Sequence, residues 1–324
     1  MESLLRVEDL NVRYKSYRGE LKVLDDVSFE VKVREKVGLI GESGCGKTTL
    51  LKSILRILPP NSIIYKGKIF FKNIEIIKAN KNEIFKIRRE NIGMIFQDPM
   101  SALNPFFKVK DQLYDALRYS VHNIKSQQDL QQMIIKLLKE VALSDSERIL
   151  ESYPFELSGG MRQRVCIALA LTRSNDLLLA DEPTTNLDVT IQEQILNLLR
   201  ELVNKRGLSI VLVSHALGMV KEFVDKIYVM YAGQIVETAS TDKIFSEPLH
   251  PYTKLLLSAV PRLTGRWKAE GLIGRLPDYV NPPPGCRFYM RCQQSNSNCK
   301  IKPKLLKLNK DHSVACWLYG DEEH

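Results

Sequence analysis

The sequence predicts an α/β fold with a mostly parallel sheet and a small loop-rich C-terminal extension. Two observations carry this prediction. Short apolar runs alternate with segments of helical periodicity, a rhythm typical of parallel sheets covered by helices. After about residue 245 the composition becomes rich in proline: eight of the fourteen prolines lie between Pro248 and Pro303. We therefore expect a main domain over residues 1–245 and an extension over 246–324.

Length and composition exclude several classes of protein. The 324 residues are 44% hydrophobic and 26% charged, which suits a globular chain and excludes disordered, collagen-like and disulfide-framework proteins. No apolar run approaches the roughly 18 residues of a membrane span. The N-terminus, MESLLRVEDL, has acidic residues where a secretory signal needs a basic patch and an apolar block. We expect a cytoplasmic chain. Its net charge of +9 suits nucleic acid, anionic lipid or an acidic partner and selects none of them.

The first elements in chain order are strands. Apolar and polar side chains alternate through residues 4–12 and 22–33, which predicts half-buried strands, and residues 67–77 are a further expected strand. Residues 37–40 form a short apolar run before Gly41. From Thr48 to Leu58 the apolar positions recur at helical spacing, and a pair of prolines stops the predicted helix.

Helices dominate the middle of the chain. Residues 108–150 show helical periodicity with Gln- and Lys-rich polar faces and contain neither Gly nor Pro. A second βα rhythm follows. Its expected elements are a helix at 160–172, a strand at 177–180, a helix at 189–205 and a strand at 209–214.

A phosphate-binding motif follows the run at 37–40. The segment Gly41-Glu-Ser-Gly-Cys-Gly-Lys47-Thr48 fits GxxxxGK[ST] between an expected strand and an expected helix. Glycines let the backbone turn its N–H groups inward on a phosphate chain, and the helix N-terminus adds partial positive charge. Lys47 is suited to the β- and γ-phosphates and the Thr48 hydroxyl to Mg²⁺. The motif predicts binding of ATP or GTP.

Two acids end the apolar strand at 177–180. Side chains alternate along a strand, so Asp181 and Glu182 are expected to point in different directions. Many strands end in an acid, but next to a phosphate loop the pair is typical of a Mg²⁺-organising aspartate and a water-activating glutamate.

A second anion-binding motif precedes this strand. In Leu157-Ser-Gly-Gly-Met-Arg-Gln-Arg164, Ser158 and two glycines stand at an expected helix start, where backbone N–H groups and a hydroxyl are unpaired. One alternative is an ordinary helix cap. The other is a donor cluster that serves the γ-phosphate held by another subunit.

The ordered set of motifs resembles ATP-binding cassette (ABC) ATPases. LSGGMRQRV resembles their signature sequence, Gln97 in FQDPMSALNP resembles the Q-loop glutamine, Asn186-Leu187-Asp188 resembles the D-loop, and His215 resembles the switch histidine. Tyr14 is similar in position to the aromatic that stacks on adenine. The resemblance implies a P-loop ABC ATPase core, with an antiparallel β part at the N-terminus and a helical subdomain at about 100–165.

The resemblance also implies roles for named residues. Two cassettes would face each other head to tail and share two ATP molecules. The catalytic residues would be Glu182, His215 and Gln97, and the Mg²⁺ ligands Thr48, Gln97 and Asp181. The nucleotide-binding residues would be Tyr14, Gly41, Ser43, Gly44, Cys45, Gly46, Lys47, Thr48, Thr49, Asp181, Ser158, Gly159, Gly160 and Asp188. The sequence departs from the family pattern at Asn186, where many relatives have a small residue, and at Ala216, where an acid often follows the histidine.

Four of the six cysteines lie within 31 residues near the C-terminus, at Cys286, Cys292, Cys299 and Cys316. A cytoplasmic chain disfavours disulfides, and the tight pairs of common zinc sites are absent. The spacing leaves a [4Fe–4S] cluster and zinc open as alternatives.

Family resemblance extends to this segment. The sequence from His250 to Thr253 and the tail GCRFYMRC…C…HSVAC resemble the C-terminal extension of the ATPase subunits of oligopeptide, dipeptide and nickel importers. Some members of that group have an iron–sulfur cluster. The resemblance implies that all four cysteines are cluster ligands, in a structural role.

The function expected first is the ATP-hydrolysing subunit of a membrane importer of dipeptides or oligopeptides. Its implied partners are two transmembrane permeases, a second related ATPase or itself as a head-to-tail dimer, and, indirectly, an extracytoplasmic solute-binding protein. It would work at the cytoplasmic face of the membrane, with no direct contact to nucleic acid. The alternatives are a cassette ATPase that acts on ribosomes or nucleic acid and a regulatory subunit without hydrolysis. Nickel and sugar stay open as cargo.

Overall fold

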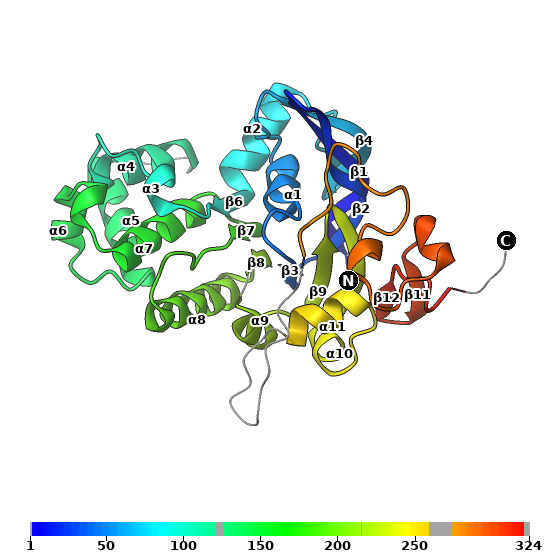
Figure 1. Ribbon diagram of the computed structural model, residues 1–324. Helices are drawn as coiled ribbons and strands as arrows, with labels where there is room; N and C mark the ends of the chain where they lie inside the picture. The colour runs from blue at the N-terminus through cyan, green and yellow to red at the C-terminus, as the bar shows by residue number, and fades with distance from the viewer. Residues whose placement is uncertain (1, 121–125, 215, 259–273, 321–324) are drawn as a thin grey trace. The chain divides into compact units, whose positions relative to one another are not determined.

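The computed structural model describes residues 2–120, 126–214, 216–258 and 274–320 (Figure 1). The chain forms two compact units, one made of residues 1–78 with 215–324 and the other of residues 79–214. Strands and helices occur in both units, as the predicted α/β class requires. No helix in the described part of the chain is long and apolar enough to cross a bilayer.

The first unit begins with an antiparallel sheet, as expected for the N-terminal part. Its strand order is β2-β1-β4-β5. The bounds are β1 (Ser3–Ser16), β2 (Gly19–Lys32), β4 (Ser62–Phe71) and β5 (Ile74–Glu75). The strand expected at 67–77 is divided in two, because Lys72 adopts a left-handed φ of 52° that turns the chain between β4 and β5.

A second sheet in the same unit places the phosphate loop. Its strand order is β11-β12-β10-β9-β3, with β3 parallel to β9 and the other pairs antiparallel. The bounds are β3 (Lys36–Ile40), β9 (Lys226–Tyr231), β10 (Gln234–Ser240), β11 (Leu306–Asn309) and β12 (His312–Val314). Residues near the C-terminus therefore extend the sheet that contains β3.

Short helices accompany this sheet. Their bounds are α1 (Lys47–Ile54), α9 (Leu217–Phe223), α10 (Thr241–Ser246) and α11 (Pro251–Ser258), with 3₁₀ turns at Tyr289–Arg291 and Ser297–Lys300. The helix expected up to Leu58 ends earlier, at Ile54. Arg56 has a left-handed φ of 50°, which ends the helix before the proline pair.

The second unit contains the parallel βα segment that the sequence predicts. Its strands run in the order β8-β7-β6, all parallel. The bounds are β6 (Ile92–Ile95), β7 (Leu177–Asp181), β8 (Ser209–Val213) and α8 (Val189–Arg206). Every residue of β7 and β8 is buried, as expected for strands covered on both faces. Helix α8 ends where Gly207 takes a left-handed φ of 64°.

In the described residues of this unit, five helices and a 3₁₀ turn lie between β6 and β7. The bounds are α3 (Pro99–Ala102), α4 (Val109–Ser120), α5 (Gln127–Glu140), α6 (Ser146–Glu151), a 3₁₀ turn at Pro154–Glu156, and α7 (Gly159–Leu171). Helices α5, α6 and α7 each contact α4, and α3 contacts α7, so these segments pack together (Figure 1). This group corresponds to the expected helical segment at about 100–165.

Sequence reasoning missed α2 (Lys81–Glu90), although a local signal is present. Asn80 accepts a hydrogen bond from the Glu83 N–H, and the Glu83 carboxylate accepts one from the Asn80 N–H. This reciprocal capping box satisfies two of the free amides at the helix start. The spacing of Asn80 and Glu83 could have marked the beginning of this helix.

Candidate nucleotide-binding site

The phosphate loop leaves the buried strand β3 at Gly41. Gly41 has φ 154°, and a Cβ atom there would lie 2.1 Å from the Met230 carbonyl oxygen on β9. Only glycine fits this close approach of two backbones. Gly44 and Gly46 have left-handed φ angles of 78° and 109°, which curl the loop into the start of α1. Helix α1 has no side-chain cap at its N-terminus, so its first amides are directed to the loop without competition from a side chain.

Lys47 lies folded into this loop. Its ammonium donates to the Gly41 carbonyl at 2.8 Å and to the Glu42 carbonyl at 2.9 Å, and Cys45 Sγ lies 3.7 Å away. The side chain is buried, and its charge is held by loop carbonyl groups. A phosphate chain in the loop would offer the same ammonium a stronger, charged acceptor.

Other predicted nucleotide-binding residues surround the first turn of α1. The Tyr14 hydroxyl on β1 lies 3.2 Å from the Thr49 hydroxyl. Ser43 and Gly44 are exposed, and Cys45 is fully buried. The structure therefore brings Tyr14 together with the phosphate loop, although the two segments are separate in the sequence.

In the second unit, Glu182 and Gln97 meet at the end of β7. The Gln97 amide donates to Glu182 Oε2 at 2.8 Å, and the Thr185 hydroxyl donates to the same oxygen at 3.2 Å. Glu182 has a left-handed φ of 47°, and its N–H donates to the Val213 carbonyl of β8. Asp181 and Glu182 are both buried. Two donors thus hold the Glu182 carboxylate in place.

The signature segment forms the N-terminus of α7. Ser158 is the N-cap, and its hydroxyl accepts from the Met161 N–H at 3.3 Å. Ser158 is exposed. A Cβ at Gly159 would lie 3.2 Å from Leu187 in the D-loop, so glycine allows the two segments to pack closely. The signature and the D-loop, about 28 residues apart in sequence, are therefore neighbours.

The D-loop leads into α8. Asn186 has a left-handed φ of 62°, a conformation that Asn adopts more readily than most residues. This backbone conformation gives a physical reason for Asn186, the departure from the family pattern noted in the sequence. Asp188 is the N-cap of α8 and makes no side-chain cap hydrogen bond. His215, the predicted switch residue, lies outside the described residues.

The four C-terminal cysteines are free thiols, as is each of the other two cysteines. Burial, together with the nearby Cys299, Cys316 and Cys292, raises the pKa of Cys286 to about 11. The Cys286 N–H donates to the Cys299 carbonyl at 2.9 Å. The four thiols are therefore gathered in one region. No group of three or more His, Cys, Asp or Glu side chains in the described residues is arranged to hold a metal ion.

Sequence reasoning missed a set of contacts between the C-terminal segment and the phosphate loop. The Arg291 guanidinium makes two 2.8 Å hydrogen bonds to the Glu42 carboxylate, and Arg291 Nη1 lies 3.2 Å from the Tyr231 hydroxyl. The hydrogen bond to Glu42 raises the pKa of Arg291. No local pattern could have paired residues that are 249 positions apart in the chain.

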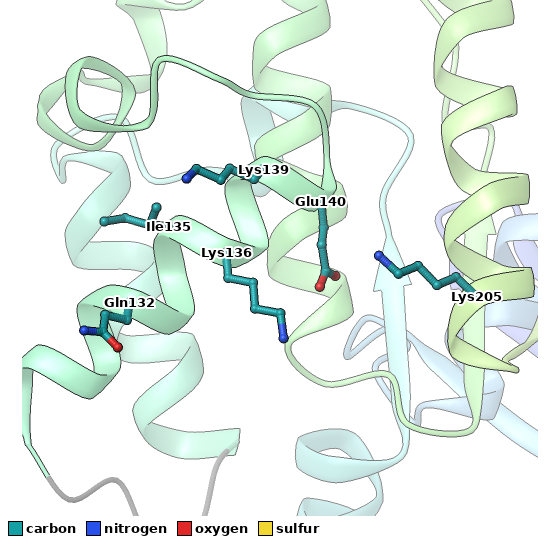
Figure 2. Close-up of a pocket in the computed structure, with 6 residues that line it drawn as sticks. All are labelled: Gln132, Ile135, Lys136, Lys139, Glu140 and Lys205. Atoms are coloured by element: carbon teal, nitrogen blue, oxygen red, sulfur yellow. The ribbon is translucent and has the colours of Figure 1, made fainter.

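A separate hollow in the second unit has no part in this chemistry. The hollow has a volume of about 520 Å³. In Figure 2, Lys205 of α8 faces side chains of α5. Glu140 at its edge pairs with Arg206 at 2.6 Å. None of the predicted site residues lines the hollow. Its lining is Gln132, Ile135, Lys136, Lys139, Glu140 and Lys205.

Comparison with known families agrees with these features. A family model described as "ABC transporter" matches residues 24–185, and one described as "Oligopeptide/dipeptide transporter, C-terminal region" matches residues 236–299. The first match contains the phosphate loop and the acids after β7, and the second contains three of the four clustered cysteines.

Several relatives match along almost the whole chain. The dipeptide transport ATP-binding protein DppD of Bacillus subtilis (strain 168) is 42% identical over 98% of this chain and 95% of its own length. The oligopeptide transport ATP-binding protein AppD of the same organism is 40% identical over 99% of this chain and 98% of its own. A putative peptide import ATP-binding protein of Brucella abortus (strain 2308) is 41% identical over 93% of this chain and 90% of its own.

Solved structures share the fold. The ATP-binding cassette MJ0796, in a dimeric post-hydrolysis state bound to ADP and Pi, is 29% identical with a TM-score of 0.66, over 73% of this chain and 98% of its own. CbiO1 of Clostridium perfringens, part of an ABC transporter complex, has 28% identity and a TM-score of 0.64, over 76% of this chain and 92% of its own. These likenesses confirm the predicted P-loop ABC fold. The chain belongs to the ABC transporter family and is one of its ATP-hydrolysing, ATP-binding proteins.

Proposed function

We propose that this chain is the ATPase subunit of a membrane importer of dipeptides or oligopeptides. One observation carries the proposal: 42% identity to a dipeptide transport ATP-binding protein extends over 98% of the chain, including the C-terminal region. The relatives named above are transport proteins, which favours an importer over an ATPase that acts on ribosomes or nucleic acid. The nucleotide-binding domain would be residues 1–245, and the extension residues 246–324.

The proposed chemistry assigns each motif a task. Lys47 and the amides at the start of α1 would bind the nucleotide phosphates, and Tyr14 would stack on the adenine. Thr48, Gln97 and Asp181 would hold Mg²⁺, which supplies charge neutralisation at the phosphates. Glu182 would orient and polarise the attacking water, with His215 holding the γ-phosphate. The hydrogen bonds from Gln97 and Thr185 to Glu182 support this role, since they orient the carboxylate before ATP binds.

Transport also requires membrane partners. Large apolar side chains close to Gln97 in the sequence are exposed, and Phe106 is 85% exposed. Exposed aromatic residues on a compact unit are typical of protein interfaces. We propose that this surface receives the permeases at the cytoplasmic face of the membrane. It consists of Phe96, Met100, Phe106 and Phe107.

The signature segment supports a dimer of cassettes. Ser158 is exposed at the N-terminus of a 13-residue helix, where backbone amides favour an anion. We propose that Ser158, Gly159, Gly160 and Asp188 complete the nucleotide site of a second cassette, either a copy of this chain or a related subunit. The dimeric state of the MJ0796 cassette gives a precedent for this assembly.

Replacement of Glu182 tests the proposed catalysis. Glu182→Gln keeps the size and hydrogen-bonding capacity of the side chain but removes the charge that polarises water. We expect ATP turnover to fall by at least about 100-fold and an ATP-bound dimer to accumulate, measured by phosphate release and size-exclusion chromatography. The matched control is Glu201→Gln, an exposed acid of α8, with turnover like the wild type.

Two results would contradict the scheme. Undiminished hydrolysis by Glu182→Gln would remove this residue from its role. Wild-type protein whose specific rate stays constant on dilution below its dimer dissociation constant would show that one chain contains a whole active site. Transport itself would be tested with labelled dipeptide in vesicles that contain the permeases, where Glu182→Gln should abolish uptake.

We further propose that Cys286, Cys292, Cys299 and Cys316 hold a [4Fe–4S] cluster, with zinc as the alternative. The donor chemistry fits, since four thiols without disulfide partners lie in one region. In the described arrangement they are not positioned as a ligand set. The proposal therefore requires their side chains to reorient on metal binding. A bound cluster would supply covalent cross-links to a segment with little regular structure.

Metal analysis distinguishes the two alternatives. Protein purified without oxygen should contain about four irons per chain and a brown absorbance, and replacing Cys299 and Cys316 together by Ser should remove both. Protein replaced instead at Cys166, a buried thiol of α7, should keep its iron. Zinc without iron in folded anaerobic protein would favour zinc, and neither metal would overturn the proposal.

A further inference from the structure

Glu42, a variable position of the phosphate motif, is fixed at each of its polar groups. Its N–H donates to the Tyr252 hydroxyl at 2.8 Å, and its carbonyl accepts from the Lys47 ammonium at 2.9 Å. Its carboxylate accepts both hydrogen bonds of the Arg291 guanidinium at 2.8 Å. Two of these three partners, Tyr252 and Arg291, come from the C-terminal segment, and the third is the phosphate-binding lysine.

The Arg291–Glu42 pair is well shielded from water. The side chains of Arg291 and Glu42 are only 9% and 19% exposed. Its two parallel N–H···O bonds have the geometry that arginine provides and lysine does not. Breaking a pair of this kind costs more than breaking an exposed ion pair, because it leaves a charge without its partner in a poorly hydrated place.

A second C-terminal contact with the loop is made at Gly44. The Tyr279 hydroxyl donates to the Gly44 carbonyl at 2.8 Å, and the Tyr279 carbonyl accepts from the Lys22 N–H of β2. Residues 274–279 and the loop residues Glu42 and Ser43 line a common hollow of about 760 Å³. The C-terminal segment thus contacts the loop at Glu42 and at Gly44.

The negative charge of Glu42 bears on ATP binding. A carboxylate in a loop that receives three or four negative phosphate charges repels them unless a cation neutralises it. Lys47 is needed by the phosphates themselves. Arg291 is the cation that pairs with Glu42 in the structure, and it also restrains the residue whose carbonyl holds Lys47.

We propose that Arg291 is a positioning residue for ATP binding: through Glu42 it neutralises and orders the phosphate loop from the C-terminal segment. This role acts through Glu42 and assigns Arg291 no contact with the nucleotide. The inference rests on the proposed role of Lys47 and its loop in phosphate binding, and it assigns the C-terminal segment a part in nucleotide affinity in addition to any metal site.

A double-mutant cycle on the full-length chain tests this role. The variants are Arg291→Gln, Glu42→Gln and the double replacement, each titrated with a fluorescent ATP analogue and Mg²⁺. We expect Arg291→Gln to weaken affinity about tenfold, because it leaves the Glu42 charge beside the phosphates. Glu42→Gln removes that charge and should change affinity less than about threefold, and the double variant should return to that level. KM should follow affinity while kcat changes less than about twofold.

Controls separate positioning from general damage. Lys302→Gln removes another C-terminal cation, paired at 2.9 Å with Asp25 and at 2.7 Å with Asp26, two residues of β2 rather than of the phosphate loop. It should leave ATP affinity unchanged. Arg291→Lys keeps the charge without the double hydrogen bond and should lie between wild type and Arg291→Gln. If Arg291→Gln fails to fold, Arg291→Lys and Glu42→Gln with the double variant provide the comparison.

The outcomes are distinguishable. Wild-type affinity in Arg291→Gln, or a double variant weaker than Arg291→Gln alone, would overturn the positioning role. Lys47→Ala that binds the analogue as tightly as wild type would instead overturn the proposed phosphate loop, whatever Arg291 does.

Discussion

At the scale of single residues, the phosphate loop contains a cysteine thiol, that of Cys45, which is completely buried. Cys45 is 0% exposed, and its Sγ lies 3.7 Å from the Lys47 ammonium. Burial raises the pKa of Cys45, although the neighbouring lysine acts in the opposite direction. The thiolate is the nucleophilic form of cysteine, so this residue is expected to be slow to react at neutral pH. Cys292 is the single cysteine with intermediate exposure among the six.

The more exposed cysteines should therefore be alkylated faster than the buried ones. In metal-free protein at pH 7 we expect a maleimide to modify Cys292 first and Cys45 slowly, measured by peptide mass spectrometry. The Cys45 rate should rise about tenfold per pH unit up to its raised pKa, because the thiolate fraction rises by that factor. Nucleotide should slow labelling of Cys45 further. Modification of Cys45 before Cys292 would show that the loop opens readily in solution.

At the scale of elements, Ser158 at the start of α7 has two roles. It caps the helix, and it is proposed to bind the γ-phosphate of a second cassette. Ser158 caps the helix by accepting from the Met161 N–H, and the same exposed hydroxyl is proposed to contact a γ-phosphate. The cap alone contributes about 1 kcal/mol. A negative group near a helix N-terminus stabilises the helix but repels a phosphate. A negative side chain at position 158 should therefore preserve helix capping and prevent phosphate binding.

Two substitutions at Ser158 separate the two roles. Ser158→Asp keeps a cap acceptor, so the free energy of unfolding should change by less than about 0.5 kcal/mol, while ATP hydrolysis should be lost through repulsion of the γ-phosphate. Ser158→Ala should lower the free energy of unfolding by about 1 kcal/mol and impair hydrolysis less. Denaturant unfolding and phosphate release measure the two effects. Full hydrolysis by Ser158→Asp would confine Ser158 to capping.

At the scale of the whole molecule, a buried histidine links the C-terminal segment to acid stability. His250 is 1% exposed, accepts from the Tyr252 N–H through Nδ1 at 3.0 Å, and lies against Phe288. Burial, with a smaller contribution from Lys254, lowers the pKa of His250 to about 3. In the unfolded chain the same group has a pKa near 6.5. Between these values the unfolded chain binds a proton that the folded chain does not.

Stability should accordingly fall as the pH is lowered. The unfolded state gains proton binding below pH 6.5, so the free energy of unfolding should decrease by about 1.5 kcal/mol from pH 6.5 to pH 5. His250→Asn keeps an acceptor in place of Nδ1 and should remove most of this decrease. Denaturant titrations at the two pH values measure it. An equal decrease in wild type and His250→Asn would assign the acid sensitivity to other groups.

Some elements could be predicted from the sequence because their signals are local. The strands β7 and β8 and the helices α7 and α8 follow from apolar runs, periodicity and Gly207. By contrast, β9, β10, β11 and β12 were not predicted. β9 pairs with β3 and β12 pairs with β10, which are distant in the chain, and such pairing decides whether a short segment becomes a strand. The hairpin pairs β9–β10 and β11–β12 are local. The left-handed turns at Lys72 and Arg56, which end elements early, have no sequence signal in those residue types.

The nucleotide chemistry of this protein follows from short stretches of its sequence. The phosphate loop, the acids after β7 and the signature helix each consist of contiguous residues, and their backbone geometry arises within a few positions. The contacts of Glu182 with Gln97 and of Glu42 with Arg291 span 85 and 249 positions and arise only when the chain folds. The physical reason is that such pairs form only after the sheets that carry them have packed, so their partners depend on the whole core.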